Sequence, residues 1–115
     1  MKYFHAHSIE CSNEDDVLSI RIADDEFDPI DFIILSYDQS EKVLQLIVNE
    51  DDFEFNDVVT AILLKHDELT VGLNTSCAER LEYNQIVIEL NADTSELKDH
   101  LRYITKELNI KSKIA

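Results

Sequence analysis

The sequence predicts an α+β fold: an antiparallel sheet meander of about six to seven strands, with one long C-terminal helix packed on a face. Three patterns indicate this class: strict alternation over residues 17–23, two apolar runs around a polar linker in residues 58–73, and one apolar stripe over residues 94–109. A short helix or turn is expected near residues 75–82. The 115 residues suffice for one domain, so we expect residues 1–115 to form a single domain.

Four strands are expected in the first half of the chain, at residues 2–10, 17–23, 32–37 and 43–49. In the second of these, Leu18, Ile20 and Ile22 alternate with a second set of side chains. Because successive side chains of a strand point to opposite faces, this segment has one buried and one exposed face. Polar turns between the strands rely on Asn, Asp and Ser, since the chain holds one glycine and one proline.

Two acidic loops are expected, at residues 24–31 and 50–57. In the first loop we expect Phe27 and Ile30 to tuck inward, as large apolar side chains usually do.

The second loop holds Phe53 and Phe55 on one parity. They either anchor the loop to the core or form exposed anchors ringed by carboxylates, which would suit a basic partner.

The second half of the chain predicts a hairpin, a further strand and a helix. Two aliphatic runs in residues 58–73 flank the tetrapeptide Lys65-His66-Asp67-Glu68, and residues 85–90 read as a strand. The helix is indicated by Leu97, Leu101, Ile104 and Leu108, which recur at i, i+4, i+7 and i+11.

The ends of this helix are also predicted. Asp93 is the expected N-cap and Glu96 completes a capping box. Residues 111–115 are expected to be a loose tail.

The composition excludes several classes of protein. No apolar run approaches the roughly 20 residues of a membrane span, and the N-terminus lacks the apolar region of a secretory signal. Cys11 and Cys77 lie far apart and form no metal-type pair, so free thiols in the cytoplasm are the expectation. A chain with one glycine has no glycine-rich phosphate loop.

The net charge of −15 is unevenly placed along the chain. Residues 1–57 hold 16 acidic and three basic residues (−13), whereas residues 58–115 hold nine acidic and seven basic residues (−2). Such a field repels nucleic acid and attracts a basic protein, although it also serves solubility alone. We therefore expect neither a nucleic-acid nor a membrane partner.

Side chains capable of catalysis or metal binding lack a diagnostic pattern. His5 and His7 point to one side of a strand, but a zinc site needs further ligands. The acidic loops lack the glycine of calcium-binding loops, and Cys77 has no histidine in register. We predict no enzyme activity, no catalytic, cofactor-binding or metal residues, and no cofactor.

Four stretches carry a family resemblance: DFIILS at 31–36, LQLIVNED at 44–51, TAILLKHDELTVGL at 60–73, and the run 74–104, which contains QIVIEL and SELKDHLRYI. With these stretches the chain resembles the immunity protein 10 family of bacterial polymorphic-toxin systems. The family's glycine-containing segment corresponds to residues 53–58, which hold no glycine.

The resemblance implies that the chain binds and neutralises a cognate toxin domain, with no catalytic residues carried over. Many such toxins attack nucleic acids and are basic, which would match the acidic half of this chain. The expected partner-binding residues are Asp24, Asp25, Glu26, Asp28, Glu50, Asp51, Asp52, Phe53 and Glu54. We expect a monomer or a homodimer.

Other functions fit the same sequence. The chain could be an acidic adaptor or subunit of a larger assembly without enzymatic activity. A small hydrolase that uses carboxylates, or a homodimer paired along an open sheet edge, are further alternatives.

Overall fold

The computed structural model describes residues 1–49 and 53–115, and within this part of the chain it has two five-stranded sheets and two helices. Sheet A consists, in spatial order, of β1 (Lys2–Ala6), β9 (Gln85–Leu90), β8 (Glu68–Leu73), β7 (Val59–Lys65) and β10 (Lys111–Ile114). Sheet B consists of β2 (Ser8–Glu14), β3 (Val17–Ala23), β4 (Phe32–Asp38), β5 (Val43–Val48) and β6 (Glu50–Asn56).

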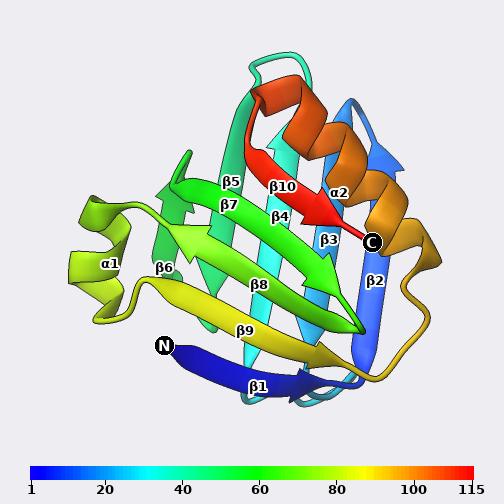
Figure 1. Ribbon diagram of the computed structural model, residues 1–115, viewed down its shortest axis with the longest axis vertical. Coiled ribbons are helices and arrows are strands. Elements are labelled where there is room, and N and C mark those ends of the chain that lie inside the picture. Colours follow the sequence, from blue (N-terminus) through cyan, green and yellow to red (C-terminus); the bar gives the residue numbers. More distant parts are fainter.

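The two sheets lie face to face, and the strands of sheet A cross those of sheet B (Figure 1). One hydrophobic core fills the space between them and includes side chains of both sheets and of the long helix. This arrangement is an orthogonal type of sheet packing, in which helix α2 (Ser95–Leu108) covers the part of sheet B that sheet A leaves open (Figure 1).

Sheet B is an antiparallel meander whose register follows from its alternating sequence. Ile20 lies opposite Leu35, which lies opposite Leu46, and all three are fully buried. Because every second residue of β3, β4 and β5 points into the core, the residues between them form an outer face that neither sheet A nor α2 covers.

Sheet A is mixed, and its outer strands come from the two ends of the chain. β1 pairs in parallel with β9, and β10 pairs in parallel with β7, while the central pairs are antiparallel. Parallel partners far apart in sequence leave no local turn signal, which is why the sequence did not predict them.

The α+β class and the C-terminal helix packed on a sheet are confirmed, but four predictions about the strands are wrong. There are ten strands in two sheets among the described residues, not about six to seven in one meander. The predicted strand at residues 2–10 is two strands in different sheets, and the predicted acidic loop at 50–57 is largely β6. The expected loose tail forms β10.

The helix ends also differ from the prediction. Thr94 is the N-cap of α2 and makes no side-chain capping hydrogen bond, whereas the Asp93 carboxylate accepts bonds from the Ser95 amide and hydroxyl at 3.0 and 2.8 Å. The short helix α1 (Thr75–Leu81) is confirmed, with Asn74 as its cap. The side-chain oxygen of Asn74 accepts a hydrogen bond from the Cys77 amide at 3.0 Å.

Candidate partner-binding surface

The charge asymmetry of the sequence becomes an asymmetry between the two layers. Residues 8–57, which build sheet B and its turns, hold 16 acidic and two basic residues, a formal charge of −14. The remainder of the chain holds nine acidic and eight basic residues, a formal charge of −1. Since the inner face of sheet B is apolar, the described acidic side chains of this layer lie on its outer face and in its turns.

The outer face of sheet B has an uncharged polar row at its centre. This row crosses all five strands through residues opposite one another, which are Ser12, Ser19, Ser36, Gln45 and Asn56. Aliphatic side chains flank the row on β3, β4 and β5, and they are Val17, Ile34, Val43 and Ile47. All four are half-buried.

Acidic side chains surround this uncharged centre. Glu10 and Glu14 project from β2 and Glu54 projects from β6, so they occupy the two edges of the outer face. Arg21 is a basic residue near the centre, and its guanidinium lies 6.0 Å from the centre of the Phe32 ring. Apart from Arg21 and Asp38 on the two inner strands β3 and β4, the middle of the face is uncharged and its edges are charged, which is the usual layout of a protein–protein interface.

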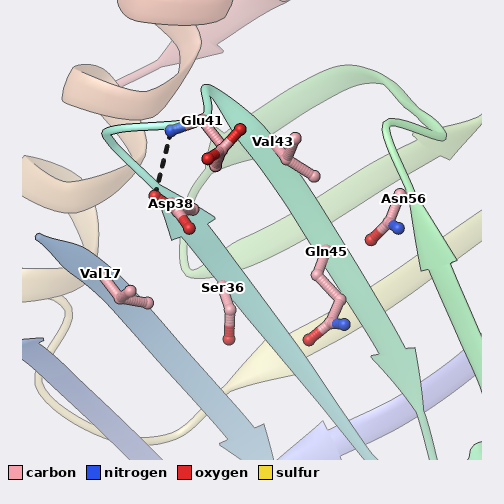
Figure 2. Close-up of a pocket in the computed structure, with 7 residues that line it drawn as sticks. All are labelled: Val17, Ser36, Asp38, Glu41, Val43, Gln45 and Asn56. Carbon is pink, nitrogen blue, oxygen red and sulfur yellow. Dashed lines mark hydrogen bonds between the residues drawn. The ribbon is translucent and has the colours of Figure 1, made fainter.

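A shallow hollow of about 390 Å³ lies at one end of this face (Figure 2). It is lined by Val17, Ser36, Asp38, Glu41, Val43, Gln45 and Asn56. The Asp38 carboxylate accepts hydrogen bonds from the Ser40 hydroxyl at 2.8 Å and from the Glu41 amide at 3.2 Å. These bonds hold the pKa of Asp38 below its usual value, so the hollow keeps a fixed negative charge.

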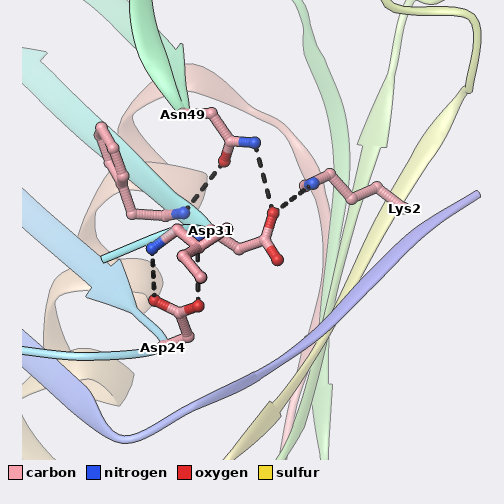
Figure 3. Close-up of polar contacts among 6 residues, drawn as sticks. Lys2, Asp24, Asp31 and Asn49 are labelled. Atoms are coloured by element: carbon pink, nitrogen blue, oxygen red, sulfur yellow. Dashed lines mark hydrogen bonds and ion pairs between the residues drawn. The ribbon is translucent and has the colours of Figure 1, made fainter. Parts of the chain in front are cut away.

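The acidic loop at residues 24–31 lies at the opposite end of sheet B, where the β5–β6 junction also lies (Figure 3). The Asp24 carboxylate accepts from the amides of Ile30 at 3.0 Å and Asp31 at 3.2 Å. Asn49 joins the two connections, because its side-chain oxygen accepts from the Phe32 amide at 3.0 Å and its amide donates to Asp31 at 3.3 Å.

The tip of the same loop is held by a second aspartate. The Asp25 carboxylate accepts hydrogen bonds from the amides of Phe27 at 3.1 Å and Asp28 at 2.8 Å. These bonds lower the pKa of Asp25. The prediction that Phe27 and Ile30 tuck inward is wrong: Phe27 is 87% exposed and Ile30 is 81% exposed. Carboxylate–amide bonds, rather than apolar burial, hold the loop in place.

The structure brings together only part of the predicted partner-binding set. Asp24, Asp25, Glu26 and Asp28 share one loop, and Glu54 lies on the outer face of β6, where it accepts from Gln45.

The other members of the predicted partner-binding set are not placed on this acidic surface. Phe53 is half-buried and packs against the core, and Phe55 is buried, so the core-anchor alternative holds for Phe55. Glu50, Asp51 and Asp52 lie outside the described residues.

Other acidic residues of this surface were not predicted. Glu10, Glu14 and Asp38 share the outer face with Glu54, and Glu41 lies beside them in a turn. The alternation of residues 17–23 identified one exposed face, but its neighbours depend on the register of the whole meander.

In the described part of the chain, the cysteines and histidines do not gather into a metal site. Burial raises the pKa of the Cys11 thiol to about 11 and also raises that of Cys77, and neither cysteine is in a disulfide. His5 lies 3.5 Å from the Glu89 carboxylate in β9, and His7 lies between β1 and β2. Over residues 1–49 and 53–115, no group of three or more His, Cys, Asp or Glu side chains is arranged to hold a metal ion.

The outer face of sheet A differs in charge from that of sheet B. A hollow of about 310 Å³ lies over Gly72 and Ala61, with Leu63 on one side and the side chains of Lys111 and Lys113 on the neighbouring strand. The two faces of the sandwich therefore present different chemistry to solvent.

The fold and this surface define a two-sheet α+β protein in which sheet B and its turns carry most of the negative charge. In comparisons with known proteins, no family model matches the chain, and no curated protein matches it. No helix in the described part of the chain is long and apolar enough to span a membrane.

Proposed function

We propose that the chain is an immunity protein: it binds a basic toxin domain through the acidic outer face of sheet B and its loops, and it neutralises the toxin without catalysis. The observation that carries this proposal is the confinement of the formal charge to one layer, −14 against −1. A charge needed only for solubility has no reason to gather in one sheet of a sandwich.

The arrangement of the face supports a protein as the occupant. The row of Ser, Gln and Asn side chains offers hydrogen-bond donors and acceptors, and its aliphatic neighbours offer apolar contact. A five-stranded sheet face whose hollow is open to solvent suits a protein partner better than it encloses a small molecule.

Electrostatics explains how such a protein would inhibit. Carboxylates at the rim attract a basic domain and increase its association rate by up to about a thousandfold at low salt. Once bound, they occupy the lysines and arginines with which a nucleic-acid-degrading toxin grips phosphate. Inhibition follows from occupation of that surface.

The experiment that tests this proposal uses the C-terminal domain of the protein encoded by the adjacent gene. Cells that produce this domain should stop growing, and co-production of the present chain should restore growth. The purified pair should form a one-to-one complex by light scattering. If the domain is toxic and the present chain neither restores growth nor binds it, the proposal is wrong; an acidic adaptor would show this result.

A further inference from the structure

The loop at residues 24–31 displays two large apolar side chains in solvent. Phe27 is 87% exposed and Ile30 is 81% exposed, and they are separated by only two residues. Single exposed apolar residues are ordinary on protein surfaces. Two in one short loop, each almost completely exposed, are unusual, because burying apolar side chains of this size against the core would stabilise the folded state.

Hydrogen bonds define the conformation of the loop, so this exposure is built into the fold. Four backbone amides of the loop donate to the carboxylates of Asp24 and Asp25 over 2.8 to 3.2 Å. The Asp24 amide also donates to the Asp31 carbonyl at 3.0 Å, which closes the loop at its base. Lys2 and Asn49 fix Asp31 from the two neighbouring segments (Figure 3). A preorganised loop loses little conformational entropy when it binds.

The charge around the two side chains specifies the chemistry of their partner. Glu26 and Asp28 flank Phe27 in the sequence, and both are exposed. Resting on the proposed function, we infer that this loop tip is the apolar anchor of the complex. Phe27 and Ile30 enter an apolar pocket on the basic domain, and Glu26 and Asp28 meet lysine or arginine side chains at the pocket rim.

This anchor has a kinetic signature that separates it from the surrounding charge. Rim charges mainly set the association rate, whereas a buried aromatic anchor mainly sets the dissociation rate. Removing both apolar side chains should therefore leave association within about twofold and speed dissociation at least about tenfold, the effect expected of a hot spot.

The experiment compares F27S/I30S with a matched control, L63S, by surface plasmon resonance against the adjacent-gene toxin domain. Leu63 is 39% exposed on the outer face of sheet A, outside the proposed interface. F27S/I30S should keep the wild-type melting temperature, because its two side chains are 87% and 81% exposed, whereas L63S, whose side chain is 39% exposed, should lower it by a few degrees without unfolding the chain. The inference predicts at least about tenfold faster dissociation for F27S/I30S and no change for L63S.

The outcomes separate the inference from the proposed function. If wild type binds and F27S/I30S dissociates at the wild-type rate, the anchor is wrong while the proposed function stands. Equal acceleration in F27S/I30S and L63S also overturns the anchor, since the effect is then not local. If the wild-type chain does not bind the toxic domain, the proposed function fails and the anchor fails with it.

Discussion

The Lys2 ammonium lies 2.6 Å from the Asp31 carboxylate, and this ion pair joins the first strand of sheet A to the acidic loop at the end of sheet B (Figure 3). Both side chains are less than a third exposed, so solvent screens the pair only in part. The N-terminal strand thus contributes to the position of the loop that carries Phe27 and Ile30.

Replacing Lys2 by Met should lower stability modestly and loosen the loop. K2M retains the apolar stem but leaves Asp31 without its 2.6 Å partner, and partly shielded pairs of this kind contribute about 1 kcal/mol. Urea denaturation should show a free energy of unfolding lower by about this amount. K65M is the matched control, because Lys65 is exposed at the end of β7. Equal effects of K2M and K65M would contradict the structural role of the pair.

Asp25 should control local order at the loop tip. D25A removes the acceptor of the Phe27 and Asp28 amides, so hydrogen exchange at these two amides should accelerate while the core strands exchange at their wild-type rates. D28A removes a neighbouring carboxylate but leaves both amide bonds in place, and it should exchange as wild type does. Unchanged exchange in D25A would mean that the loop is not held by this carboxylate.

Three aspartates should stay ionised at unusually low pH. Hydrogen bonds from nearby amides and hydroxyls lower the pKa of Asp25, Asp38 and Asp93 in the folded chain. A depressed folded pKa adds stability that is present above the unfolded value of about 3.9 and is lost as pH falls through the folded value. Carboxyl carbon shifts followed by NMR should give midpoints below that unfolded value, and midpoints at or above it would show that these bonds are absent in solution.

Deleting residues 111–115 tests whether the C-terminus is a strand or a loose tail. The pairing of β10 with β7 and the packing of Ile114 against the core would both be lost. We expect a free energy of unfolding lower by about 2 kcal/mol, from several ladder hydrogen bonds and part of one apolar side chain. A truncated chain as stable as the full one would favour the loose tail.

The sequence predicts local structure well wherever one face is buried. Residues 17–23 and 95–108 show the periods of a half-buried strand and of an amphipathic helix, and both elements form. The division into two sheets could not be predicted, because the consecutive strands β6 and β7 belong to different sheets and the outer strands of sheet A pair in parallel, β1 with β9 and β10 with β7. No local turn encodes either pairing.

The surface shows where residue type alone fails to predict which side chains are buried. Phe27 and Ile30 were expected inside because large apolar residues usually are buried. The carboxylates of Asp24 and Asp25 instead accept hydrogen bonds from the loop amides, and these bonds hold the loop while the two apolar side chains stay exposed. Phe55 is buried although it lies among acids, since β6 continues the alternation of sheet B. Residue type alone does not separate these cases; the register of the strands and the partners of the loop amides do.

The most direct measurement is the association rate of the adjacent-gene toxin domain with two matched triple variants, followed by stopped flow at increasing ionic strength. E10Q/E26Q/E54Q neutralises exposed acids of the sheet B layer, and E68Q/E79Q/E107Q neutralises exposed acids elsewhere. We expect the first triple to associate about tenfold more slowly than wild type at low salt and the second within about twofold, with the difference shrinking as salt rises. Equal slowing by both triples would contradict a partner bound on the acidic face.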